Sequence, residues 1–124
     1  MTAKEKKDKI VNAVREAFDE YREAHKDSDM IKTTSELVEI AKAKGIVPKD
    51  FQPSDYCYNR LNGGMDFTDK DDLLIQTRLF EYLERGKYQI LGMNYPYTGD
   101  VWHKPKGGKE EKVGEWKDGK YKKL

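Results

Sequence analysis

Apolar residues recur at helical spacing over the first part of the chain. Between Lys4 and Ala24 they fall at i, i+4, i+7, i+8 and i+11, and charged residues occupy most of the remaining positions. This single stripe predicts an amphipathic helix that packs one face on a core. The stripe consists of Ile10, Val14, Ala17, Phe18 and Tyr21. A polar connection, His25–Asp29, follows, and Met30–Lys32 is predicted to form a short strand.

A second apolar pattern follows a recognisable helix start. Thr33 and Glu36 have the S/T-x-x-E spacing of a capping box, in which each side chain bonds the backbone N–H of the other residue. Gly45 stands where a residue in the left-handed conformation would end the helix. The pattern therefore predicts a second helix between Thr33 and Gly45. Its apolar residues at helical spacing are Leu37, Ile40 and Ala41.

The stretch Pro53–Asn62 is expected to form a third helix. Proline is tolerated in a first helical turn, where its missing N–H is not needed, and two glycines after Asn62 end the helix. At about 100° per residue, Cys57 and Leu61 point the same way and are expected to be buried, with Asn59 on the exposed side. Three helices in this order are typical of a helix-turn-helix, whose last helix commonly enters a DNA groove.

Two interpretations compete for Thr68–Leu83. Acidic residues near its start and apolar residues at helical spacing are compatible with a helix. The β-rich runs Arg78–Leu83 and Lys87–Leu91 flank a glycine-containing turn and favour a hairpin instead. We prefer the hairpin, after a short helical turn at Asp69–Ile75. In a winged-helix protein this hairpin would be the wing.

The last part of the chain combines aromatic residues with lysines. Prolines and glycines interrupt Gly92–Lys106 and predict an irregular extension, and Asp118-Gly119 is a turn signal farther on. The aromatic side chains either cover an open edge of the core or stack on nucleic-acid bases. These side chains are Tyr95, Tyr97 and Trp102.

Charge is balanced over the whole chain but not along it. Hydrophobic residues make up 36% and charged residues 38% of the 124 residues, which predicts a modest core under a densely charged surface, and the formal net charge is only +1. Between Lys104 and Leu124, eight lysines stand against four acidic residues, so this end carries +4. Such an end either faces an anionic partner or is a solvated tail.

Cysteine content, hydropathy and the N-terminal residues predict a soluble cytoplasmic protein. Cys57 is the only cysteine, so no internal disulfide can form, which favours a reducing setting. No apolar run approaches the ~20 residues that a membrane span needs. Met1–Lys9 is polar, unlike a secretion signal.

The sequence contains no recognisable catalytic, nucleotide-binding or metal-binding motif. No phosphate-binding loop, dinucleotide fingerprint or H-E-x-x-H motif occurs, and Cys57, His25 and His103 lack metal-ligand spacing. Cys57 is expected to be a small core residue. The acidic cluster Asp66–Asp72 is interpreted as a helix start or solvated loop. We therefore expect no catalytic residues, no metal site and no cofactor.

The order of helix, capped helix, helix and hairpin resembles the winged helix-turn-helix superfamily over Ile10–Leu91. The runs PSDYCYNR, LFEYLERGKYQILG and NYPYTG also resemble a small module of restriction-endonuclease-like and phage or mobile-element proteins. The resemblance implies an α+β fold, with three helices and a β-hairpin wing in residues 1–92. An irregular aromatic and Lys-rich extension, residues 93–124, would pack on it and end in a partly flexible segment. The implied setting is DNA contact or DNA defence.

We predict a non-catalytic DNA-binding module whose third helix probes the major groove of double-stranded DNA. Asparagine can pair with an adenine edge there, and the wing and the extension would contact phosphates. The residues assigned to this surface are Tyr56, Tyr58, Asn59, Arg60, Asn62, Arg85, Lys87, Tyr88, Lys104, Lys106 and Lys109. The alternative is a protein–protein interaction module, such as a small phage-encoded inhibitor or a restriction-complex subunit, because a fold alone does not decide function.

Overall fold

A capped amphipathic helix begins the fold in the computed structural model, which describes residues 1–124. α1 (Ala3–Ala24) starts with a capping box between Thr2 and Glu5. The predicted apolar stripe is confirmed, and Ile10 and Tyr21 lie at its partly buried margins. The fully buried residues of the helix are Val11, Val14, Ala17 and Phe18.

β1 (Ile31–Thr33) and α2 (Thr34–Lys42) follow, as the sequence pattern predicts. Glu36 N donates to Thr33 Oγ1 at 3.2 Å, and Thr33 N donates to Glu36 Oε1 at 2.9 Å. The capping box therefore satisfies two N–H groups that the helix start leaves free. Gly45, with a φ of +84°, follows the end of the helix in the left-handed conformation that glycine adopts without strain.

Thr33→Ala is expected to lower the free energy of unfolding by about 1 kcal/mol, because a backbone N–H at the start of α2 loses its acceptor. Urea denaturation of the two proteins measures the difference. Ser35→Ala is the matched control in the same helix, since Ser35 is exposed and its replacement should change stability by less than about 0.5 kcal/mol. Equal losses in both variants would contradict the stabilising role of the cap.

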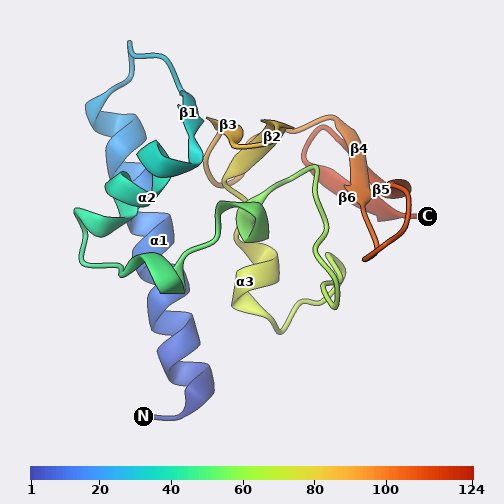
Figure 1. The fold of residues 1–124 in the computed structure, drawn as a ribbon, viewed down its shortest axis with the longest axis horizontal. Coiled ribbons are helices and arrows are strands. Elements are labelled where there is room, and N and C mark those ends of the chain that lie inside the picture. The colour runs from blue at the N-terminus through green and yellow to red at the C-terminus, as the bar shows by residue number, and fades with distance from the viewer.

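Three antiparallel strands form the first sheet in the order β1-β3-β2. β2 (Phe80–Glu84) and β3 (Lys87–Ile90) are joined by a tight turn, so the predicted hairpin is confirmed. The main core lies between this sheet and the two long helices (Figure 1). At its centre the rings of Phe18 and Phe80 meet edge to face, with their centroids 4.8 Å apart.

The helix predicted over Pro53–Asn62 is wrong. Only a single 3₁₀ turn forms there, η2 (Pro53–Tyr56), and a similar turn, η1 (Pro48–Asp50), precedes it. The short helical turn predicted before the hairpin is present as α3 (Leu73–Gln76), which is capped by Asp72. The chain between α2 and β2 is therefore built mostly from turns and extended segments.

Residues beyond the hairpin form a second antiparallel sheet, where the prolines and glycines had suggested an irregular extension. Its strands are β4 (Gly99–His103), β5 (Glu111–Lys117) and β6 (Lys120–Lys123), in that order. The predicted turn at Asp118-Gly119 joins the last two strands. Its φ values of +49° and +83° match the type I′ turn that suits the twist of a hairpin.

The stretch Tyr56–Leu61, which begins at the last residue of η2 and continues in extended conformation from Cys57, joins the two sheets and is called the linking segment below. Tyr58 N donates to Phe80 O at 2.8 Å, at the edge of the first sheet, and Leu61 N donates to Trp102 O at 2.9 Å, at the edge of the second sheet. A second backbone hydrogen bond accompanies each of these. Because these bonds replace those of a helix, and because tyrosine favours extended backbone, the segment does not coil.

Candidate nucleic-acid interface

The two tyrosines of the linking segment that were assigned to DNA contact are buried. Tyr56 is 3% exposed, and its ring centroid lies 5.8 Å from that of Phe51 and 6.5 Å from that of Phe80. Tyr58 is also 3% exposed, and its hydroxyl donates to Gly92 O at 2.6 Å. Burial raises the pKa of both hydroxyls. Neither side chain can reach a phosphate, which contradicts their predicted role.

Both asparagines assigned to base reading bond within the protein. Asn59 Nδ2 donates to Tyr82 O and Asn59 Oδ1 accepts from Tyr82 N, each at 2.8 Å. Asn59 thus pairs with the backbone of β2 as a neighbouring strand would, and its amide is not free for an adenine edge. Asn62 Nδ2 donates to Asp55 Oδ1 at 2.6 Å. The structure contradicts a base-reading role for both side chains.

Arg60 is partly exposed, but its charge is engaged. Its guanidinium forms an ion pair with Glu110, and its Cζ lies 4.2 Å from the centroid of the Tyr82 ring. A cation held between a carboxylate and an aromatic face has little free charge to offer a phosphate. Arg60 therefore serves mainly to fasten the linking segment to β2 and to the connection before β5.

The hairpin turn lies against α2 instead of projecting as a free wing. Thr34 N donates to Gly86 O at 3.1 Å. Lys87 Nζ lies 3.5 Å from a carboxylate oxygen of its own hairpin, and Tyr88 is buried in the core, which excludes the predicted contact. Arg85 is exposed and forms no ion pair, so it is the residue of the predicted wing that stays available.

Alternating side chains give the second sheet an inner and an outer face. Val101 is fully buried, and Trp116 Nε1 donates to Tyr58 O at 2.7 Å, so these residues face inward. Successive residues of a strand point to opposite sides, and a register shift after Val101 brings Lys112 beside Trp102. The outer face consists of Asp100, Trp102, Lys112, Glu115, Lys117, Lys120 and Lys122.

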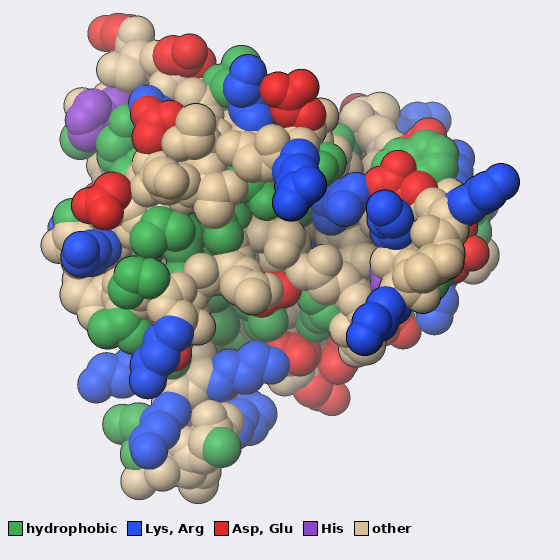
Figure 2. Space-filling view, viewed as in Figure 1, with side chains coloured by type: hydrophobic (Ala, Val, Ile, Leu, Met, Phe, Trp, Pro, Cys, Tyr) green, Lys and Arg blue, Asp and Glu red, His purple; other side chains and the backbone are tan.

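Four lysines stand against two carboxylates on this outer face. Lys112 Nζ lies 3.0 Å from Asp100 Oδ1 and 3.3 Å from Glu115 Oε2, and hydrogen bonds to these carboxylates raise the pKa of Lys112. Trp102, which is 37% exposed, lies on the same face. Figure 2 shows several Lys and Arg side chains over the second sheet, on the right of the view. The lysines without an ion-pair partner are Lys117, Lys120 and Lys122.

The lysines predicted to contact phosphate from the extension are exposed and form no ion pair. They lie in the connection between β4 and β5, directly after the strand that carries Trp102. The sequence analysis counted the lysines of β5 and β6 only toward the positive charge of Lys104–Leu124 and did not assign them to DNA contact. The alternation of aromatic residues and lysines from Trp116 to Lys122 is the signal that could have identified them. The predicted lysines are Lys104, Lys106 and Lys109.

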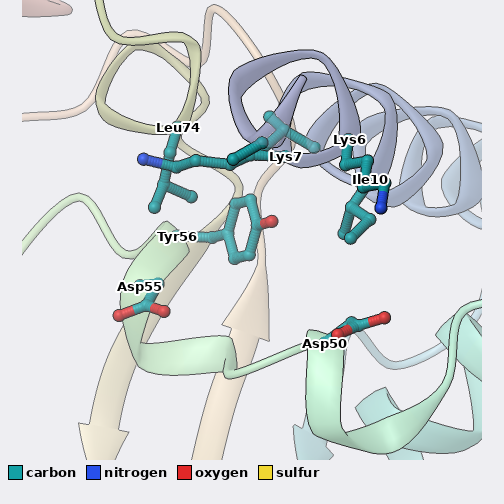
Figure 3. Close-up of a pocket in the computed structure, with 9 residues that line it drawn as sticks. Lys6, Lys7, Ile10, Asp50, Asp55, Tyr56 and Leu74 are labelled. Carbon is teal, nitrogen blue, oxygen red and sulfur yellow. The ribbon is translucent and has the colours of Figure 1, made fainter. Parts of the chain in front are cut away.

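A groove of about 340 Å³ opens at the N-terminal end of α1. Figure 3 shows the Tyr56 ring in this groove, with Lys7 on the side of α1 and Asp50 and Asp55 on the 3₁₀ turns. Lysines and aspartates thus border an apolar floor that includes Ile10 and other residues of α1. Because charges of both signs surround it, this groove is a poor site for a DNA backbone.

Cys57 has the environment of a core residue. It is 0% exposed, and burial raises the pKa of its thiol to about 12. The reactive and metal-binding form of cysteine is the thiolate, which this environment disfavours. No group of three or more His, Cys, Asp or Glu side chains in the structure is placed to hold a metal ion.

The fold and the site define an α+β protein in which an extended segment joins two small antiparallel sheets, one of them with a lysine-rich outer face. The chain belongs to the family described as Domain of unknown function (DUF7225), whose model matches residues 7–123. It is 45% identical over 76 residues to the uncharacterized protein YnaC of Bacillus subtilis (strain 168). That match covers 60% of this chain and 26% of the relative, so the chain corresponds to only part of the relative's length. No solved structure matches the chain.

None of the helices of this protein combines the length and the apolar character needed to cross a membrane.

Proposed function

We propose that the protein is a non-catalytic DNA-binding module that contacts phosphates through the outer face of the second sheet. The observation that carries this proposal is the group of three lysines without ion-pair partners on one exposed face that also carries Trp102. Lysines that neutralise phosphates release counterions from DNA, and an exposed aromatic ring can stack on a base. The exposed lysines between β4 and β5 would add contacts at the end of this face.

Binding of this kind discriminates little between DNA sequences. Contacts from lysine to phosphate position a protein on the duplex without reading bases. The side chains that could have read base edges, Asn59 and Asn62, bond within the fold. We therefore propose an affinity that depends on salt more than on sequence.

We also propose that residues 1–92 are related to winged-helix proteins. The order α1, β1, α2, α3 and hairpin, with the strand order β1-β3-β2, supports this relation. The main difference is that a single turn, α3, stands where a recognition helix would lie. A phage or restriction setting is proposed from the sequence resemblance alone.

Replacing Lys117, Lys120 and Lys122 together with glutamine is expected to weaken binding to duplex DNA at least tenfold at low salt. The slope of log K against log salt should also become shallower by about 3, because each lost phosphate contact removes about one unit. Fluorescence anisotropy with a labelled duplex at several salt concentrations measures both quantities.

The matched control carries the same change in charge elsewhere, at three exposed lysines that form no ion pair. These are Lys9, Lys42 and Lys49. The control should keep nearly the affinity and slope of the wild-type protein. Equal losses in the two triple variants, or no binding of wild-type protein at low salt, would overturn the proposal.

A protein partner is the second candidate, and the groove at the N-terminal end of α1 favours it. Its volume of about 340 Å³ and its lysines and aspartates suit an amphipathic segment of another protein better than DNA. Reversing a charge at Lys7 or Asp50 would weaken such binding and leave DNA affinity unchanged, whereas the glutamine triple variant would do the opposite.

A further inference from the structure

Arg78 is a buried cation between the two sheets. It is 4% exposed. Its Nη1 donates to Cys57 O at 2.8 Å, and its Nη2 donates at 2.6 Å to both Asp55 O and Leu74 O. Its Cζ also lies 4.8 Å from the centroid of the Phe67 ring. The guanidinium therefore fastens η2, the linking segment and α3 to the start of β2.

Arg78 forms no ion pair, and the nearby carboxylate of Asp55 stabilises its charge only at longer range. Its Nε is the one buried side-chain nitrogen or oxygen in the structure without a hydrogen-bond partner. Burial lowers the pKa of the guanidinium to about 10, so the group still carries its charge at neutral pH. Buried charges in proteins are normally paired, and an unsatisfied buried donor is rare.

A small cavity of about 90 Å³ has Arg78 in its wall. The cavity lies where the linking segment, α3, the segment after β3 and the second sheet meet. Asn94, at this junction, has a φ of +59°, which is uncommon for a residue with a Cβ atom. The residues that share the wall with Arg78 are Tyr58, Gln76, Met93, Asn94, Tyr95, Trp116 and Gly119.

We propose that this cavity binds a compact oxyanion, a phosphate or carboxylate group, whose charge compensates that of Arg78. The small size of the cavity suits a phosphate or carboxylate group better than a larger metabolite. The side-chain amide of Asn94 is a second polar group in this wall beside Arg78, whereas the amide nitrogen of Gln76 already donates to Lys70 O. This site is distinct from the lysine face, and it does not depend on the proposed contact with DNA.

The two tryptophans provide matched reporters for this proposal. Trp116 lines the cavity, and its indole N–H donates to the linking segment, whereas Trp102 lies on the outer face. Sodium phosphate, sodium acetate and sodium chloride are added separately to ¹⁵N-labelled protein at constant pH and ionic strength. The expected result is a saturable shift of the Trp116 indole signal with phosphate or acetate, with a dissociation constant below about 10 mM, and no shift with chloride.

The pattern of shifts separates the possible outcomes. Saturation with phosphate alone identifies a phosphate site, and saturation with acetate alone identifies a carboxylate site. Shifts of Trp102 without Trp116 would place the anions on the lysine face and overturn the proposal. Identical responses to all three salts would overturn it as well, while the DNA titrations of the lysine variants would be unaffected by either result.

Asn94→Gly tests the cavity without removing the cation. Glycine keeps the positive φ at this position, so the fold should be retained while the side-chain amide is lost. The variant should bind the anion at least threefold more weakly than the wild-type protein, with unchanged DNA affinity. Gln52→Ala, at an exposed position outside the cavity wall, is the control and should bind the anion like the wild type. An unchanged anion affinity in Asn94→Gly would count against the assignment.

Discussion

Arg78→Leu is expected to lower the free energy of unfolding by about 3–5 kcal/mol. The side chain is 4% exposed, and its guanidinium donates to backbone carbonyls of η2, the linking segment and α3. Leucine fills much of the space but donates nothing, so Asp55 O and Cys57 O would lose the donor that satisfies them. Each such loss inside a protein costs about 1–3 kcal/mol. Urea denaturation followed by tryptophan fluorescence measures the change.

Arg85→Leu is the control for this prediction, because Arg85 is exposed and forms no ion pair. Its effect should stay within about 0.5 kcal/mol. The loss of unfolding free energy in Arg78→Lys should lie between those of Arg78→Leu and Arg85→Leu. The lysine ammonium keeps the charge but cannot reach all the carbonyls that the planar guanidinium reaches. Equal stabilities for the Leu variants at the two positions would contradict the role assigned to Arg78.

Phe80→Ala is expected to cost about 3–5 kcal/mol of unfolding free energy. Phe80 is 0% exposed at the start of β2, and its ring meets Phe18 of α1 edge to face. It also contacts the rings of Phe51, Tyr56 and Tyr88, and its backbone carbonyl accepts from the linking segment. Alanine would leave a cavity where the helices, the turns and the first sheet meet.

Leu83→Ala provides the control on the same strand, because Leu83 is 40% exposed. Its replacement should cost less than about 1 kcal/mol, since little buried volume is removed. Phe80→Leu should cost less than Phe80→Ala, because most of the cavity stays filled. Comparable losses at Phe80 and Leu83 would show that the core is not centred on β2.

The elements that the sequence predicted correctly are those whose signals are local. The first helix follows from a stripe of apolar residues over several turns, and the second from the capping box of Thr33 and Glu36. The hairpin follows from β-rich runs on either side of Gly86. In each case the residues that stabilise the element lie within a few positions of one another, so the pattern carries most of the information.

The third helix failed as a prediction because its stretch is stabilised by distant residues. The partners of the linking segment are Phe80, Tyr82 and Trp102, which lie more than twenty positions away along the chain. Cys57 is buried, as expected from the helical wheel. The wheel misplaced Asn59, because an extended segment and a helix put different side chains on the same side. Tertiary contacts here override the local pattern.

The sequence predicted a basic surface in the C-terminal part of the chain but identified only some of the lysines that form it. An aromatic and lysine-rich C-terminal part was recognised, and Lys104, Lys106 and Lys109 are exposed as expected. The prolines and glycines led to the prediction of an irregular extension in place of the second sheet. Because no sheet was predicted, the lysines of β5 and β6 could not be assigned to one face. The burial of Arg78 could not be predicted either, because arginine is usually exposed and the neighbouring sequence does not distinguish a buried arginine from an exposed one.

Titration of ¹⁵N-labelled protein with a short DNA duplex at low salt tests the central claim most directly. If the outer face of the second sheet contacts phosphates, the largest amide shifts will fall on Lys117, Lys120, Lys122 and Trp102, and raising the salt will reverse them. The amides of the linking segment will stay nearly unchanged. Shifts concentrated in the linking segment, with the outer face unaffected, would contradict the account.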